Sequence, residues 1–144
     1  MILEHATCVE VEGVGVLLRG ASGAGKSDLA LRLIDGGARL VSDDYVAISA
    51  AADKLSASPP DSIAGLIEVR GLGLMATPHV ADCPLGLVVD LVAPIEVERL
   101  PAPEWVELDG VSLLRLRVAS FEASAGAKIR LAVRALDQLG NGKR

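Results

Sequence analysis

The chain has 144 residues, a length that suits one compact domain with its own hydrophobic core. Its formal net charge of −5 argues against sequence-independent binding to nucleic acid, because such binding depends on clustered Lys and Arg side chains. No apolar run approaches the roughly 20 residues that span a bilayer, and the N-terminal segment lacks the pattern of a signal peptide. We therefore expect a cytoplasmic protein without a membrane partner.

Hydrophobic residues make up 51% of the chain, but Tyr45, Trp105 and Phe121 are its only aromatic residues. The predicted core is therefore aliphatic. Cys8 and Cys83 are far apart and lack the Cys-x-x-Cys spacing of a metal or redox site. We expect both to be small buried hydrophobic residues.

The chain opens with the pattern of a β-hairpin. Val9 and Val11 alternate with glutamates, and Gly13 allows a tight turn into the apolar run of residues 14–18. A nearly continuous apolar run is typical of a strand that is covered on both faces. His5 precedes the hairpin, and an isolated histidine there is most simply a solvated residue.

A complete phosphate-loop pattern, G-x-x-x-x-G-K-[ST], follows this strand and opens a helix that Gly36 and Gly37 end. Strand, glycine-rich loop and helix is the context that the pattern requires, since backbone N–H groups and the helix N-terminus together bind phosphate. Lys26 is expected to bridge the outer phosphates of ATP, and the Ser27 hydroxyl to bind Mg²⁺. The residues predicted to bind ATP are Gly20, Ala21, Ser22, Gly23, Ala24, Gly25, Lys26 and Ser27.

Two adjacent carboxylates, Asp43 and Asp44, lie in a predicted turn between strands at residues 39–41 and 45–49. Acidic residues in turns are usually solvated. However, we expect the strand of residues 39–41 to lie beside the phosphate-loop strand, which would bring a carboxylate close to the γ-phosphate.

Residues 50–60 predict a surface hairpin or loop, and the segment after Glu68 and Arg70 is shaped by glycines. A surface ion pair between these two side chains is the simpler interpretation. Residues 85–90 form a second apolar strand, and its terminal Asp90 competes with Asp43 as the acid that holds Mg²⁺.

The last third of the chain predicts a half-exposed strand at residues 111–118 and a closing helix. The apolar face of that helix is formed by Ile129, Val133, Leu136 and Leu139. Residues 140–144 are expected to fray. The predicted fold is α/β, with a phosphate-loop core, a mostly β sheet, one helix after the loop and a C-terminal helix.

His5, the phosphate loop, the Ser-Asp-Asp turn and the segment Glu68-Val-Arg-Gly-Leu-Gly73 stand in an order that resembles the catalytic domain of HPr kinase/phosphorylase. The resemblance covers the chain from His5 to about Arg99. It implies an enzyme that uses ATP and Mg²⁺ to phosphorylate a serine of an HPr-like phosphocarrier protein. The hexameric assembly of the family also implies a homo-oligomer.

The resemblance assigns roles to individual residues. Asp43, with Asp44 beside it, matches the acid that takes the proton from the target serine, His5 matches an active-site histidine, and Glu68 matches a Mg²⁺ ligand. Arg99 matches the family's catalytic arginine at a shorter spacing. The stretch that the family needs for catalysis corresponds here to a catalytic loop of Ile67, Glu68, Val69, Arg70, Gly71, Leu72 and Gly73.

The chain departs from the family pattern in two places. It lacks the N-terminal accessory domain of full-length members, so we expect a single kinase domain over residues 1–144, similar to a short proteobacterial form. The Gly-Arg-Asn segment linked to dephosphorylation is replaced by residues 120–128, where Lys128 is the only cation. A lysine does not reproduce a bidentate guanidinium. We therefore expect the reverse phosphorolysis to be weak or absent.

A protein serine kinase is the function that the sequence predicts. The alternatives are a small-molecule kinase or NTPase that uses Asp90, and a nucleotide sensor that binds ATP without turnover. An Asn-Lys-x-Asp segment that would read guanine is missing, which argues against a GTPase.

Overall fold

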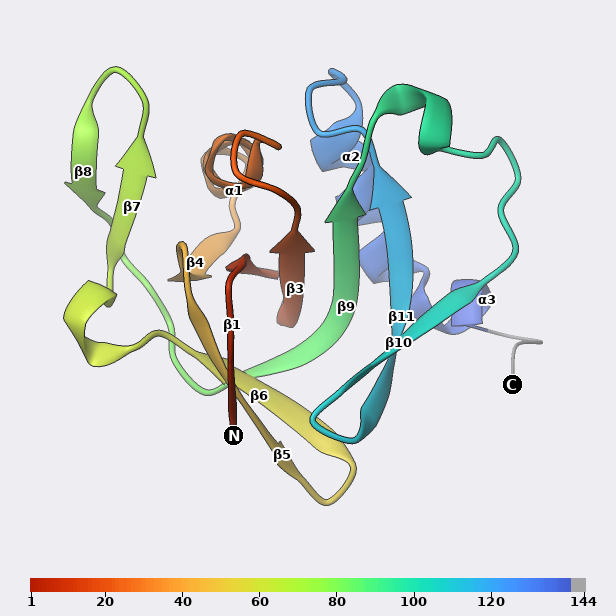
Figure 1. Ribbon diagram of the computed structural model, residues 1–144, viewed down its shortest axis with the longest axis horizontal. Coiled ribbons are helices and arrows are strands. Elements are labelled where there is room, and N and C mark those ends of the chain that lie inside the picture. Colours follow the sequence, from red (N-terminus) through yellow and green to blue (C-terminus); the bar gives the residue numbers. More distant parts are fainter. Residues whose placement is uncertain (141–144) are drawn as a thin grey trace.

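The structure is a computed structural model that describes residues 1–140. Within this range, nine strands form one mixed sheet in the order β1-β5-β6-β9-β3-β2-β4, with β11 on the second half of β9 and β10 outside it (Figure 1). The strands are β1 (Ile2–Glu4), β2 (Thr7–Val11), β3 (Val14–Arg19), β4 (Arg39–Ser42), β5 (Val46–Ala51), β6 (Lys54–Ser58), β9 (Cys83–Leu91), β10 (Glu104–Leu108) and β11 (Val111–Val118). A separate hairpin consists of β7 (Leu66–Val69) and β8 (Gly73–Ala76).

The phosphate-loop strand β3 lies inside the sheet, between β2 and β9. Val16 and Leu18 belong to the hydrophobic cluster under the helices, whereas Leu17 belongs to the cluster on the opposite face. All three side chains are fully buried. The prediction of a strand covered on both faces is therefore confirmed.

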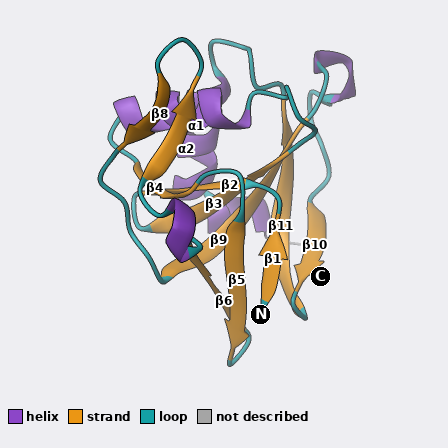
Figure 2. Ribbon diagram, turned by 60° about the vertical axis from the view of Figure 1, so that its left-hand side comes forward, coloured by secondary structure: helices purple, strands orange, loops and turns teal. Residues whose placement is uncertain are grey.

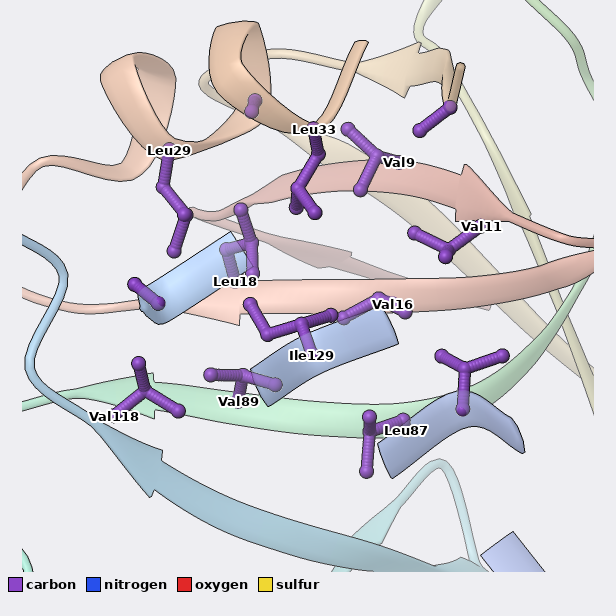
Figure 3. Packing of buried hydrophobic residues seen from close by; sticks show 14 of the residues in the cluster. Val9, Val11, Val16, Leu18, Leu29, Leu33, Leu87, Val89, Val118 and Ile129 are labelled. Carbon is purple, nitrogen blue, oxygen red and sulfur yellow. The ribbon is translucent and has the colours of Figure 1, made fainter. Parts of the chain in front are cut away.

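Helices α1 (Lys26–Asp35) and α2 (Ala125–Arg134) cover one face of the sheet. Figure 3 shows Leu29 and Leu33 of α1 and Ile129 of α2 packed over the central strands. The predicted closing helix is divided at Ala135 into α2 and the short α3 (Leu136–Gly140). The predicted fraying concerns residues 140–144, of which 141–144 lie outside the described residues.

The opposite face of the sheet carries a second aliphatic cluster, to which β5 and β6 contribute. In Figure 2 these two strands extend below the rest of the sheet, away from α1 and α2. Cys8 and Cys83 lie in this cluster as free thiols, as predicted. Burial raises the pKa of Cys8 well above its usual value and that of Cys83 to about 11. Both thiols therefore stay protonated at neutral pH and act as hydrophobic residues.

The opening hairpin forms as predicted, with Glu12 and Gly13 both at positive φ in its turn (51° and 86°). Two positive φ values are what a tight turn between twisted strands requires. The predicted neighbour of the phosphate-loop strand is wrong, however. Strand β4 pairs with β2, and β2 separates it from β3.

Two further segments differ from the sequence-based expectation. Residues 50–60 do form a hairpin, but β6 lies between β5 and β9, and its Leu55 and Ala57 are buried rather than at the surface. Strand β10 is not predicted by the sequence analysis, because it directly follows a segment with several prolines. The turn around Arg70 joins β7 to β8, with Gly71 and Gly73 at positive φ.

Asp90 lies near the end of β9, the strand beside β3, and is bound there by two arginines. Its carboxylate accepts hydrogen bonds from Arg19 Nε at 2.7 Å and Arg115 Nε at 2.5 Å, and its side chain is only 15% exposed. Burial would raise the pKa of Asp90, but the hydrogen bonds from Arg19 and Arg115 outweigh it and hold the pKa below its usual range. Asp90 thus ties β3, β9 and β11 together.

We expect Asp90→Asn to lower the free energy of unfolding by about 2 kcal/mol, because two half-buried guanidinium groups would lose their charged acceptor. Urea denaturation at neutral pH measures this loss. A carboxyl group with a lowered pKa stabilises the fold above its unfolded pKa of about 3.9, and this contribution disappears as the pH falls through the folded pKa. The difference between wild type and variant should therefore shrink below about pH 4, and a constant difference would contradict the assignment.

Candidate functional site

A cavity of about 410 Å³ lies over the phosphate loop, where the loop meets β4 and the β7–β8 hairpin. The loop, helix α1 and the hairpin lie near one another in the upper half of Figure 1. The side chains around the cavity are mostly polar. The lining residues are His5, Thr7, Ser22, Gly23, Gly25, Lys26, Ser27, Asp28, Leu31, Asp43, Asp44, Glu68, Val69, Arg70 and Phe121.

The phosphate loop has the backbone conformation that its glycines permit. Gly23 and Gly25 have φ values of 86° and 93°, which side chains disfavour. Helix α1 begins at Lys26 without a side-chain cap on its N-terminus. Its first N–H groups therefore remain available to an anion at the cavity floor.

Lys26 Nζ donates to the backbone carbonyls of Gly20 at 2.6 Å and Ala21 at 3.2 Å. These contacts hold the ammonium group against the loop, beside the cavity that it lines. Gly20, Ala21 and Ala24 do not line the cavity themselves, so of the eight predicted ATP-binding residues five reach it through their own atoms.

Asp43 joins three segments of the site. Its Oδ1 accepts hydrogen bonds from Thr7 Oγ1 and Ser27 Oγ, both at 2.8 Å, and its Oδ2 accepts one from the Glu68 N–H at 2.9 Å. The residue is only 6% exposed. Because the Ser27 proton points to Asp43, the lone pairs of the Ser27 oxygen are free for another partner.

Asp44 lines the cavity with an exposed side chain. Its backbone is left-handed, with φ at 72°, a conformation that aspartate tolerates better than most residues. Its Oδ1 lies 3.0 Å from His5 Nε2, and the His5 ring stacks on Tyr45 with ring centroids 4.9 Å apart. The two adjacent carboxylates therefore have different partners, with Asp43 turned to the phosphate loop and Asp44 to His5.

Glu68 lies on β7 with its carboxylate exposed to the cavity, while Val69 and Arg70 continue the lining toward the turn. The rest of the predicted catalytic loop has other surroundings. Ile67 is buried in the core, Gly71 and Leu72 lie in the exposed turn of the hairpin, and Gly73 begins β8. No ion pair between Glu68 and Arg70 occurs within the described residues.

A Mg²⁺ site fits this cavity in donor chemistry. Mg²⁺ prefers oxygen ligands and usually combines one or two protein groups with substrate phosphates and water. Ser27 Oγ and the Glu68 carboxylate both line the cavity, and Asp43 orients the first and bonds the backbone of the second. Among residues 1–140 there is no cluster of three His, Cys, Asp or Glu side chains that would hold a metal without a phosphate ligand.

Two predicted candidates lie outside the cavity. Asp90 is engaged by Arg19 and Arg115 and does not line it, which disfavours Asp90 as a metal-binding acid. Arg99 is exposed in the loop between β9 and β10 and is likewise not among the lining residues. Its catalytic role stays a prediction.

Sequence reasoning missed Thr7, Asp28, Leu31 and Phe121 as lining residues. The sequence pattern could have indicated Thr7, because Thr7 is polar but shares the inward face of β2 with Val9 and Val11. It could also have indicated Phe121, because an aromatic residue between Ser120 and Glu122 in a loop has no obvious place in the core. Neither pattern indicates a nucleotide by itself.

None of the helices within residues 1–140 is long and apolar enough to cross a membrane.

Comparison with known proteins gives consistent results. The family model of the HPr Serine kinase C-terminal domain matches residues 1–80. HPr kinase/phosphorylase of Clostridium tetani is 49% identical over 74 residues, and that of Thermoanaerobacter pseudethanolicus is 53% identical over 72 residues. These segments cover 51% and 49% of this chain, but only 24% of each relative.

The solved structure of the Hpr(Ser) kinase/phosphatase from Coxiella burnetii is similar over nearly the whole chain. The match has a TM-score of 0.86 and 25% identity, and it covers 99% of this chain and 100% of the other. The fold described above is therefore that of the HPr kinase catalytic domain, including the part beyond residue 80. With more than half of its residues matched by the family model, the chain belongs to the HPr serine kinase C-terminal domain family.

Proposed function

We propose that this protein is an ATP- and Mg²⁺-dependent kinase that phosphorylates a serine of an HPr-like phosphocarrier protein. The observation that carries the proposal is the bonding of Asp43, whose carboxylate joins the phosphate-loop Ser27 to the backbone of Glu68. One buried side chain thereby connects Ser27, in the loop that would bind the phosphates, to Glu68, which would bind Mg²⁺. The protein would act in the cytoplasm, where ATP is available, and the family's assembly suggests a homo-oligomer.

The residues divide the work by position. Lys26 and the N–H groups of the phosphate loop would hold the β- and γ-phosphates, and Ser27 and Glu68 would hold Mg²⁺. Bound Mg²⁺ would neutralise charge on the transferring phosphates. The serine oxygen of the substrate would then form a bond to the γ-phosphorus while the bond to ADP breaks, a reaction that depends mostly on positioning and electrostatics.

The hydrogen bonds favour Asp44 over Asp43 as the group that accepts the serine proton. Asp43 is buried and already accepts three hydrogen bonds, so a substrate hydroxyl has little access to it. Asp44 is exposed in the cavity, and His5 beside it would keep its carboxylate in place. Asp43 would then position Ser27 and Glu68, and would not accept the serine proton as the sequence predicts.

The forward direction is favoured by the charges of the segment that replaces Gly-Arg-Asn. Lys128 is paired with Glu122 at 3.1 Å, and Arg115 and Arg117 are bound to acidic partners. Phosphorolysis needs additional positive charge to hold inorganic phosphate beside phosphoserine. These cations are already neutralised, which supports a weak reverse reaction.

The direct test is incubation of the purified protein with Mg-ATP and the HPr-like proteins of its own genome. Phosphoserine on one of them, located by mass spectrometry, supports the proposal. ATP binding without phosphorylation of any carrier protein would instead support a nucleotide sensor.

For Lys26→Ala we expect ATP affinity or turnover to fall by at least about tenfold, because a charge-assisted phosphate contact is removed. Isothermal titration and a coupled ADP assay measure the two quantities. If both stayed at the wild-type level, the loop would not be the nucleotide site.

For Glu68→Gln we expect the Mg²⁺ concentration for half-maximal activity to rise by about tenfold, with an unchanged melting temperature because the side chain is exposed. Glu107→Gln is the matched control, since Glu107 is also exposed but lies on β10 and does not line the cavity. A lower melting temperature with a normal Mg²⁺ requirement would indicate a structural role for Glu68.

For Asp44→Asn we expect kcat to fall by about 10² to 10⁴, the usual contribution of a general base, with ATP affinity retained. Asp43→Asn should instead weaken Mg-ATP binding and lower the melting temperature, because an amide cannot accept all three hydrogen bonds. Asp90→Asn should change kcat only modestly. If Asp43→Asn alone abolished turnover with normal binding and stability, the sequence-based assignment of Asp43 would stand.

A further inference from the structure

The sheet order separates the cavity into two flanks. Strands β3, β9 and β11 run parallel, and their arrowheads point to the same end of the sheet in Figure 1. The loop after β3 is the proposed phosphate-binding loop, and β2 and the turn after β4 bring Thr7 and Asp43 to one side of it. On the other side, the loop after β11 brings Phe121.

Phe121 lies directly against the phosphate loop. A Cβ atom added to Gly25 would come within 2.9 Å of two carbons of the Phe121 ring and within 2.8 Å of Ser120 Oγ. The ring lines the same cavity as Lys26 and Ser27 but stays 72% exposed. It thus presents a large apolar surface to the space beside the phosphate-binding residues.

The loop that carries Phe121 is fixed in place. Ser120 Oγ donates to the Ala24 carbonyl at 2.5 Å, and Arg32 NH2 donates to the Ser120 carbonyl at 2.5 Å. Ser120 itself is 4% exposed. The position of the aromatic ring is therefore coupled to the phosphate loop and to helix α1.

We propose that Phe121 is the platform on which the base of the nucleotide stacks. This inference rests on the proposed function, which puts the γ-phosphate at the flank of Asp44 and Glu68. With the phosphates over Lys26, the ribose and base extend to the opposite flank, where Phe121 is the aromatic residue of the lining. Stacking on a fixed ring would explain why a phenylalanine is left exposed there.

Among the described residues, few free hydrogen-bonding side chains lie beside Phe121 that could distinguish adenine from guanine. The two polar side chains that flank it in the chain already have partners, since Ser120 binds the Ala24 carbonyl and Glu122 binds Lys128. Every base has a flat face that can stack, whereas selection needs hydrogen bonds to the base edge. The site is therefore a general purine nucleoside triphosphate site, and ATP and GTP should bind with similar affinity.

The test compares ligands with and without a base. Dissociation constants of Mg-ATP, Mg-GTP and Mg-tripolyphosphate are measured by isothermal titration for wild type, Phe121→Ala, Phe121→Tyr and Ile95→Ala. Ile95 is the matched control because it is 93% exposed and lies in the loop after β9. Melting temperatures verify that each variant is folded.

We expect Phe121→Ala to weaken ATP and GTP binding by about tenfold while tripolyphosphate binding stays unchanged. Phe121→Tyr should bind like wild type, and so should Ile95→Ala. An unchanged ATP affinity in Phe121→Ala, or an equal loss for tripolyphosphate, overturns the stacking role.

A preference of wild type for ATP over GTP by more than about tenfold overturns the general purine site. The failure of the proposed function is a separate result, in which wild type binds neither ATP nor tripolyphosphate.

Discussion

The buried carboxylate of Asp43 is the interaction on which the site depends. It accepts hydrogen bonds from three segments that are distant in the sequence: Thr7 on β2, Ser27 at the start of α1, and the backbone of Glu68 on β7. A buried carboxylate is tolerated only when its oxygens are satisfied, so each of the three donors also stabilises the charge. The burial of Asp43 therefore requires these three segments to meet around it, and their meeting shapes the cavity.

Because of the order of the strands, the two sides of the cavity carry different kinds of residue. The acidic residues arrive from β4 and the hairpin β7–β8, whereas the loop after β11 supplies an aromatic ring and a cation-poor segment. A nucleotide lying between the two flanks would have its phosphates and Mg²⁺ at the carboxylates and its base at the ring. The place of each strand in the sheet, and not its place in the sequence, therefore decides whether its loop brings acidic residues or the aromatic ring to the cavity.

Local features were predicted well from the sequence because they depend on few neighbours. The strand before the phosphate loop, helix α1 and the hairpin around Gly13 follow from short patterns of apolar residues and glycines. The place of β4 did not follow, since nothing local shows that β2 intervenes between β4 and β3. The burial of β6 was missed for a similar reason, because its small residues become core only through pairing with β9.

The site shows the same limit. Lys26, Ser27 and Glu68 were found by motif and resemblance, and all line the cavity. The distinct surroundings of Asp43 and Asp44 could not be found that way, because two adjacent aspartates look alike in sequence. The left-handed backbone at Asp44 and the three donors around Asp43 are properties of the folded chain.

Arg130 of α2 holds the C-terminal end of the phosphate-loop helix α1. Its guanidinium donates to the carbonyls of Arg32 and Leu33, the last turn of α1, and a side chain at Gly36 would collide with it. A cation there also complements the negative end of the helix dipole. Both ends of the phosphate-loop helix are thus braced by residues beyond position 118, although the family model ends at residue 80. The motifs matched by the family model and the residues that hold both ends of this helix therefore lie in different halves of the chain, so a fragment cut after residue 80 would keep the motifs but lose the contacts that position the helix.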